Sequence, residues 1–314
     1  EGAFGGLGRT LGRVARLAGT VAVAGLAVGL VKAGRAAVDL DRGMRNVNSI
    51  AKLSEAGLQK LTKQVLALAG PTAQAPKTLA AGLYDIVSSG FKADDAVKIL
   101  AVSAKAASAG MTNTAVAAKA VTAGLDAYHL GADQARKVSD ILFETVNKGV
   151  LTFEELSLQM GDLVPVSAPL GVTLEEVGAA MATLTLQGVP AAEAATRVKN
   201  TMLQLAKPSK EMTSLLHDLG FESGEAAIKA KGFAGFLQLV SDKTKGNVTE
   251  TAKLTPEIRA LMGIVGLTGK NLETYNAFLD DMKHAQDGAG SSARAFAEQS
   301  KSLAFQWEKA KQSL

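Results

Sequence analysis

Glycines recur about every twenty residues through the middle of this 314-residue chain, and each follows a short Ala-rich segment whose apolar residues have helical spacing. These glycines are Gly90, Gly110, Gly131, Gly149, Gly171 and Gly188. Glycine often ends a helix because it adopts the left-handed backbone conformation without steric cost. The stretch from Phe91 to Pro208 is therefore predicted to be an array of short helices rather than one continuous rod.

Helix-start signals follow several of these glycines. Thr152 and Glu155 have the spacing of a capping box, and Thr173 and Glu176 repeat it. Aromatic residues are only 4% of the chain although apolar residues are 47%, so the apolar side chains are mostly small, which favours closely packed helices over a sheet. The predicted fold class is all-α: an array of short helices joined by Gly/Pro turns, flanked by longer amphipathic or apolar helices.

Changes in composition divide the chain into five predicted parts. Residues 1–45 form a Gly-rich, basic-flanked apolar helix, and residues 46–90 form amphipathic helices. Residues 91–208 are the central array, and residues 209–255 are short helices and loops. Residues 256–314 form C-terminal amphipathic helices, which we expect to continue in a longer protein because no stop signal closes the last one.

Two local expectations follow from proline and glycine. A single amphipathic helix is predicted over residues 46–69, with Gly70 and Pro71 stopping it. The segment Asp162–Gly171 contains two prolines, so it is predicted to be the longest irregular piece inside the array.

The N-terminal part contains an uncharged run, Leu17–Val31, with Arg and Lys on both sides. As a helix it would measure about 22 Å, short of the roughly 30 Å hydrocarbon core of a bilayer. Small residues on one face of this helix would let two backbones approach closely. They are Ala18, Ala22, Gly25, Gly29 and Ala33. Three interpretations stay open: a self-associating or core-packed helix, which is favoured, a helix that enters a membrane in a later state, and a cleaved signal peptide.

The C-terminal tail has a stripe of apolar side chains at helical spacing. The predicted seam consists of Phe296, Leu303, Trp307 and Leu314. Such a stripe is typical of a helix that packs against another helix.

No catalytic, cofactor-binding or metal-binding residue is predicted. The three histidines lie far apart, and the chain has no cysteine to complete a zinc site. Paired acids such as Glu154–Glu155 fall in predicted first helical turns, where they favour the helix dipole. The Gly-rich motif Gly288–Ser292 lacks the preceding strand of a phosphate loop. Ten basic and four acidic residues lie within residues 1–63, so the net charge of +4 is no argument for nucleic-acid binding by the rest of the chain.

Several short motifs together resemble the core region of tail tape measure proteins of long-tailed bacteriophages. They include SSGF at Ser88–Phe91, AGMT at Ala109–Thr112 and LVPVSAPLGVTLEEV at Leu163–Val177. Further matches are GVPAAEAATRVKN at Gly188–Asn200 and LHDLGF at Leu216–Phe221. The resemblance covers about Leu79 to Met282, two thirds of the chain.

The resemblance implies a structural virion protein rather than an enzyme. Such a protein occupies the tail tube, sets tail length during assembly and leaves ahead of the DNA at infection. The expected partners are further copies of the chain, in a parallel homotrimer. The tail tube, tail-tip or baseplate hub proteins and a tail assembly chaperone are also expected to bind it. No sequence-specific nucleic acid and no cofactor are expected.

A second hypothesis is a membrane-active helical pore-forming protein that assists genome passage through the host envelope and reaches the host cell membrane after ejection. It rests on the small-residue stripe of Leu17–Val31. Leakage from liposomes, compared with a Gly25→Leu/Gly29→Leu variant, tests it, and no leakage at all would reject it. A wall-degrading enzyme is disfavoured because no acid/base or metal constellation accompanies the fold.

Overall fold

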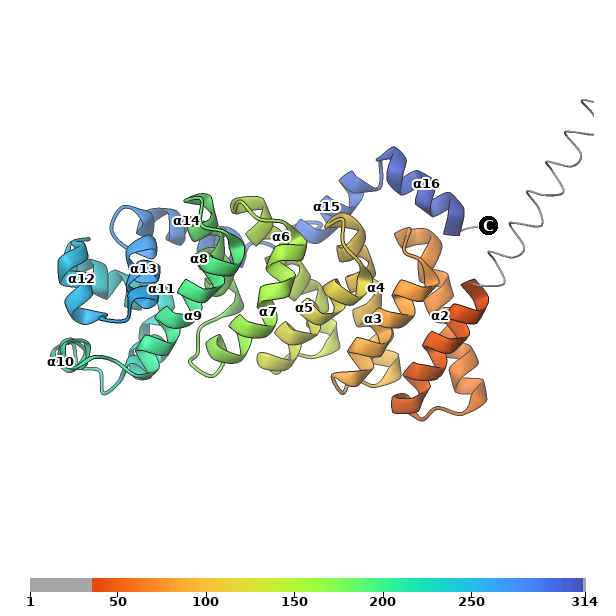
Figure 1. The fold of residues 1–314 in the computed structure, drawn as a ribbon, viewed down its shortest axis with the longest axis horizontal. Helices are drawn as coiled ribbons and strands as arrows, with labels where there is room; N and C mark the ends of the chain where they lie inside the picture. The colour runs from red at the N-terminus through yellow and green to blue at the C-terminus, as the bar shows by residue number, and fades with distance from the viewer. Residues whose placement is uncertain (1–35, 313–314) are drawn as a thin grey trace, which may run out of the picture.

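The computed structural model of the chain describes residues 36–312, and every regular element in this range is a helix, which confirms the all-α prediction. The helices form an elongated body of two layers (Figure 1). One layer begins with the N-terminal helix, described over residues 36–51, and continues through alternate helices. These are α3 (Pro76–Ser88), α5 (Thr114–Ala127), α7 (Phe153–Ser167), α9 (Ala191–Ala206) and α13 (Ile258–Leu267).

The second layer is built from the intervening helices. They are α2 (Glu55–Thr72), α4 (Ala93–Ala109), α6 (Ala135–Lys148), α8 (Leu174–Leu186) and α14 (Asn271–Lys283). Up to α9 in the first layer and α8 in the second, the packed neighbours are next but one in the chain, for example α5 on α7 and α6 on α8. Later helices complete the two layers, with α13 packed on α9 and α14 packed on α8. A short 3-10 turn, Ala132–Gln134, precedes α6. This alternation gives each short helix partners on both sides, as in solenoid proteins, so the array buries apolar surface that no single helix could bury alone.

Local capping decides where several of these helices begin. In α7 the Thr152 hydroxyl accepts a hydrogen bond from the Glu155 backbone at 3.1 Å, and the Glu155 carboxylate accepts one from the Thr152 backbone at 2.7 Å. Thr173 and Glu176 make the same reciprocal pair at the start of α8. Both predicted capping boxes are confirmed.

Glycines inside the helices allow close helix packing. A Cβ on Gly178 of α8 would meet the Thr145 hydroxyl of α6 at 2.5 Å. A Cβ on Gly263 of α13 would collide with the Thr201 hydroxyl of α9 and lie 2.7 Å from the Arg197 carbonyl oxygen. The small side chains noted in the sequence therefore bring helix backbones together, in addition to ending helices.

The end of the body away from the N-terminal helix is built from α10 (Lys210–Asp218), α11 (Gly224–Thr244) and α12 (Val248–Leu254). α11 is kinked at Gly232, whose φ is 74°. The buried Glu176 carboxylate fills this kink and accepts a hydrogen bond from the Ala234 backbone at 3.2 Å. One side chain therefore both caps α8 and fixes the bend of α11.

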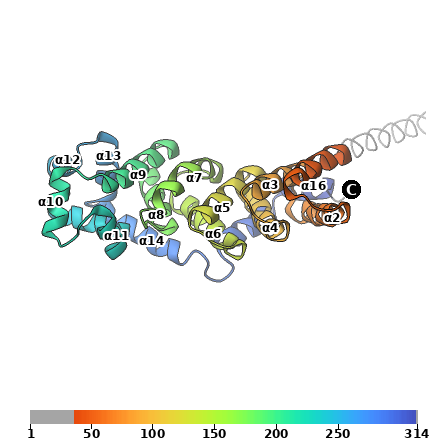
Figure 2. The same cartoon turned by 90° about the horizontal axis from the view of Figure 1, so that it is seen from below.

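After α14 the chain turns back. Residues 285–312, here called the C-terminal strap, contain α15 (Ser291–Gln299) and α16 (Leu303–Gln312). α15 crosses α4 and α6, and α16 packs on α2 (Figures 1 and 2). The described part of the chain therefore starts and finishes at the same end of the body.

Three local expectations are wrong. The helix predicted over residues 46–69 is interrupted at 52–54, because Lys52 takes a left-handed conformation (φ 51°) and the Leu53 backbone N–H donates to the Asn48 side chain at 2.7 Å. Gly70 and Pro71 do not stop it, because α2 runs through both to Thr72. The irregular piece predicted from Asp162 is helical up to Ser167, since Pro165 lies on the exposed side of α7, where water can satisfy the Gly161 carbonyl. The C-terminal tail is two helices instead of one, with a break at residues 300–302.

Candidate functional site

The paired acids of the sequence lie at helix starts in the structure, and Glu155 and Glu176 complete capping boxes there. Glu154–Glu155, Glu175–Glu176 and Asp94–Asp95 all lie in first turns. Hydrogen bonds from Thr152, led by the one from its backbone, lower the pKa of Glu155 below its ordinary value. Within residues 36–312 no cluster of His, Asp or Glu is arranged to hold a metal ion. The paired acids therefore stabilise the starts of their helices.

The densest group of buried charges in contact with the strap lies where the strap leaves α14 and crosses α6. The group, here called the Asp140 cluster, consists of Arg136, Asp140, Glu144, Ser291, Ser292 and Arg294. Asp140 is fully buried and Glu144 is nearly so. Arg136 lies close to Asp140 (Nε to Oδ2, 3.4 Å), and Arg294 donates to the Ser291 hydroxyl at 2.7 Å.

Asp140 caps α15 from another helix. Gly290, the residue at the N-cap position, has no side chain to do so. Asp140 Oδ1 instead accepts hydrogen bonds from the Ser292 backbone N–H at 2.8 Å and from the Ser292 hydroxyl. This is the bond that a Ser or Asp at the N-cap would normally make to the second residue of its own helix. The Gly-rich motif Gly288–Ser292 therefore binds an anion, and that anion is a carboxylate of the same chain.

Ion pairs and backbone contacts extend the cluster on both sides. Arg136 donates to the Ala289 carbonyl at 2.6 Å, and Ser291 donates to Glu144 Oε2 at 2.5 Å. Lys148 joins Glu144 (3.8 Å) to Asp281 of α14 (2.8 Å), and its hydrogen bond to Asp281 is the main cause of the raised pKa of Lys148. The cluster and Lys148 therefore join α6, α14 and α15, and they attach the strap to the body.

Sequence reasoning did not identify the Asp140 cluster. One signal was available, because Asp140 and Glu144 are four residues apart and surrounded by the apolar Val138, Ile141 and Leu142 of the same helix. Acids on the apolar face of a helix indicate a buried polar contact. The partner, however, follows 152 residues later, and no local pattern identifies it.

The predicted C-terminal seam is divided between the two strap helices. Phe296 of α15 is half-buried and meets Phe305 of α16 edge to face, with ring centroids 5.6 Å apart. Leu303 is 89% exposed and Trp307 is 66% exposed, and Lys311 lies over the Trp307 ring. Leu314 lies outside the described residues. Phe305, which the prediction did not include, anchors α16.

The predicted small-residue stripe cannot be placed. Ala18, Ala22, Gly25, Gly29 and Ala33 all lie outside the described residues. Within residues 36–312, no helix is long and apolar enough to cross a membrane. The membrane-active hypothesis therefore stays a prediction.

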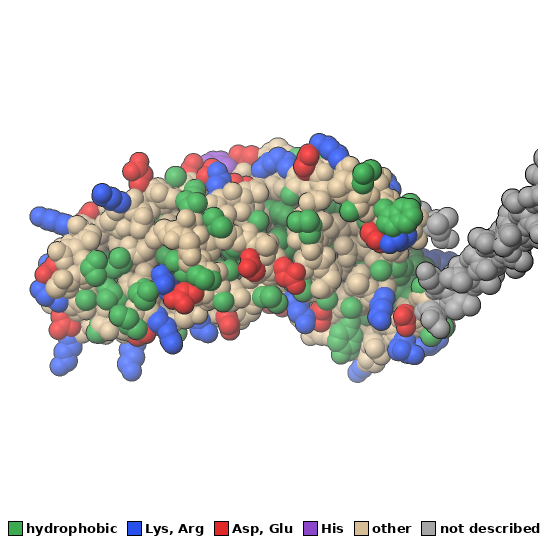
Figure 3. Space-filling view, turned by 45° about the horizontal axis from the view of Figure 1, so that its top comes forward, with side chains coloured by type: hydrophobic (Ala, Val, Ile, Leu, Met, Phe, Trp, Pro, Cys, Tyr) green, Lys and Arg blue, Asp and Glu red, His purple; other side chains and the backbone are tan. Residues whose placement is uncertain are grey.

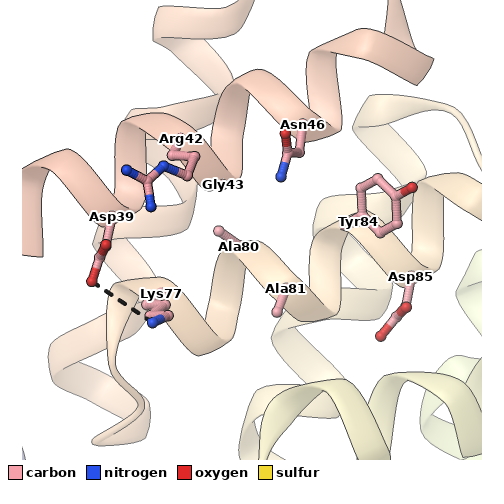
Figure 4. A pocket seen from close by; sticks show the side chains of 9 residues that line it. All are labelled: Asp39, Arg42, Gly43, Asn46, Lys77, Ala80, Ala81, Tyr84 and Asp85. Atoms are coloured by element: carbon pink, nitrogen blue, oxygen red, sulfur yellow. Dashed lines mark ion pairs between the residues drawn. The ribbon is translucent and has the colours of Figure 1, made fainter.

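A shallow groove of about 320 Å³ lies between the N-terminal helix and α3 (Figure 4). Its acids have cationic neighbours: Asp39 is 3.7 Å from Lys77, and Asp85 is 3.9 Å from Lys119. Burial raises the pKa of Asp85, and the Lys119 charge partly opposes this. The lining shows no set of unpaired polar groups that converge on one point, so the groove has no evident chemistry.

The face shown in Figure 3 carries both signs of charge, with small groups of apolar side chains between them. A surface that binds the nucleic-acid backbone would present a patch of basic side chains. This face has no such patch.

Comparison with known proteins identifies the family. The sequence model for phage-related minor tail proteins matches residues 62–266, about two thirds of the chain. The chain belongs to this family. The match to phage-related minor tail proteins runs from α2 into α13, so it covers most of the two-layer array together with α10, α11 and α12. Family membership confirms the resemblance to phage tail proteins noted from the motifs.

Two similar proteins are much longer than the chain. A probable tape measure protein of Clostridium phage phiCD119 is 26% identical over 306 residues, covering 94% of this chain and 32% of the relative. The tape measure protein of Pneumococcus phage Dp-1 is 25% identical over 296 residues, covering 92% of this chain and 25% of the relative. The chain thus spans about a third and a quarter of these two proteins. No solved structure gives a significant match.

Proposed function

We propose that this chain is a folded section of a phage tail tape measure protein and that it has a structural, non-enzymatic role in the virion. The observation that carries the proposal is the family match over residues 62–266, which covers most of the two-layer array. The names of the two relatives support it. The clusters of buried polar groups described above stabilise the fold, which is what a structural role needs.

The whole protein would occupy the tail tube, set tail length during assembly and leave ahead of the DNA. Its partners would be further copies of itself in a homotrimer, the tube, tail-tip or baseplate hub proteins and the assembly chaperone. The two relatives are long enough for a separate length-determining part, because most of their residues lie beyond the matched region. In this proposal the array is a folded body carried by the ruler, and the rest of the ruler provides most of the length.

In-frame deletions in the phage that encodes this chain test the proposal. Removal of coding sequence outside residues 36–312 should shorten tails in proportion to the residues lost, as measured by electron microscopy of purified particles. Recoding the same stretch with synonymous codons is the matched control and should leave tail length unchanged. Tails of normal length after the deletion would contradict the ruler function.

A further inference from the structure

The C-terminal strap is attached to the body by few apolar side chains. Within residues 285–312 the buried apolar side chains are Ala285 and Phe305, and Ala295 and Phe296 are half-buried against the core. By contrast, α8 buries side chains along most of its length. Burial of apolar surface is the main stabilising contribution to folding, at about 25 cal/mol per Å². The strap therefore belongs to the least stable part of the molecule, where local opening takes place without global unfolding.

Beside these apolar contacts, the strap is held by bonds that are polar and directional. Asp140 binds two groups of Ser292, Glu144 accepts from the Ser291 hydroxyl, and Arg136 donates to the carbonyl of Ala289. Hydrogen bonds weaken steeply once donor and acceptor move out of line. A small displacement of the strap would break these bonds together, so docked and undocked are two distinct states.

The array is able to tolerate the undocked state. α6 carries its own cations one turn from each acid: Arg136 lies 3.4 Å from Asp140, and Lys148 lies 3.8 Å from Glu144. On opening, water replaces the strap and these pairs within the helix remain. The opened body would therefore not keep an unpaired buried charge, which otherwise costs several kcal/mol.

The connection between α14 and α15 has the conformation of a tight hinge. Gly288 and Gly290 have positive φ values of 64° and 80°. Gly290 also passes so close to α6 that a Cβ would meet Asp140 Oδ2 at 2.5 Å. Glycine at this point both permits the backbone turn and lets the strap reach the carboxylate.

We infer that the C-terminal strap is a latch, which opens as a unit while the two-layer array stays folded. When the latch is closed, the chain leaves the body beside α2. When it is open, the chain leaves from the end of α14, and residues 285–312 no longer return along the array. This switch is a property of the fold and does not depend on the proposed role in the tail.

Hydrogen exchange of the full chain tests the latch. Asp140→Asn removes the charge and keeps the shape, and Ser292→Ala removes one donor with little risk to folding. Both should speed exchange of the strap amides at least tenfold and leave exchange in α8 and α9 unchanged. Glu298→Gln is the matched control, since Glu298 is an exposed acid of α15 that pairs with Lys301, and it should leave strap exchange as it was.

Three outcomes would overturn the inference. One is exchange that accelerates equally in the strap and in α8. Another is strap exchange that neither variant changes. The third is strap protection that rises with protein concentration, which would mean that straps dock on neighbouring copies. Because the chain has no cysteine, an Asp140→Cys/Ser292→Cys variant gives a second readout. Its oxidised form should protect the strap, and reduction should remove that protection.

Discussion

Asp140 accepts hydrogen bonds from both the backbone and the hydroxyl of Ser292, a residue 152 positions further along the chain, and in doing so caps a helix that has no cap of its own. A cap is normally a local feature. Here it is a tertiary contact, so α15 is complete at its first turn only while it lies on α6. Formation of the helix and docking of the strap are therefore coupled.

Two glycines inside helices should respond oppositely to alanine. In Gly263→Ala the new methyl group would collide with Thr201 and lie 2.7 Å from the Arg197 carbonyl, so overpacking should lower the free energy of unfolding by about 1–3 kcal/mol. In Gly161→Ala the methyl group meets nothing within 4 Å, so the better helix propensity should raise it by about 0.5–1 kcal/mol. Urea denaturation of both variants measures the difference. Equal effects would contradict the close approach of α9 and α13.

Two buried tyrosines should differ when each is replaced by phenylalanine. The Tyr128 hydroxyl lies 2.7 Å from the Ser167 hydroxyl and donates to the Val172 carbonyl at 3.0 Å. Tyr128→Phe should therefore lower the free energy of unfolding by about 1–3 kcal/mol. The Tyr275 hydroxyl has no hydrogen-bond partner among the described residues. Tyr275→Phe should therefore raise the free energy of unfolding or change it by less than about 0.5 kcal/mol. Thermal or chemical denaturation would detect the reverse order, which would contradict these contacts.

The same tyrosines predict a loss of stability at alkaline pH. Burial raises the pKa of Tyr128 and of Tyr275 above the ordinary value of 10.0. Above pH 10 the unfolded chain releases these protons and the folded chain keeps them, so the free energy of unfolding should fall as pH rises. Below pH 10 the two residues should contribute no pH dependence. The slope between pH 9.5 and 11, measured by urea denaturation, should be smaller in the Tyr128→Phe/Tyr275→Phe variant, and an unchanged slope would refute this assignment.

Trp307 reports directly on the predicted seam. It is the only tryptophan of the chain, and it is exposed one turn after the exposed Leu303. If copies associate through this face, Trp307 emission should shift to shorter wavelength and become harder to quench with acrylamide as protein concentration rises. Leu303→Gln should suppress both changes. Emission that is independent of concentration would contradict self-association through α16.

The sequence predicted helix starts correctly where the capping residues are close together in the chain. Thr152 with Glu155 and Thr173 with Glu176 are visible as spacings, and they form the predicted caps. Pro165 was a poor guide, because its effect depends on which side of α7 faces water. The direction of the strap was beyond local reasoning, since Asp140 and Ser292 meet only after the array has folded between them. The candidate site is made of such long-range pairs.

The return of the strap to α2 also affects the relation between residue number and tail length that the proposed ruler function predicts. The chain path goes out along the array and back again, so the N-terminal helix and α16 end up at the same end (Figure 1). Residues added between these two helices would thicken or lengthen the body without separating its entry and exit points. If the proposed ruler function holds, tail length plotted against residue number should therefore fit better once the residues of this body are deducted as a constant.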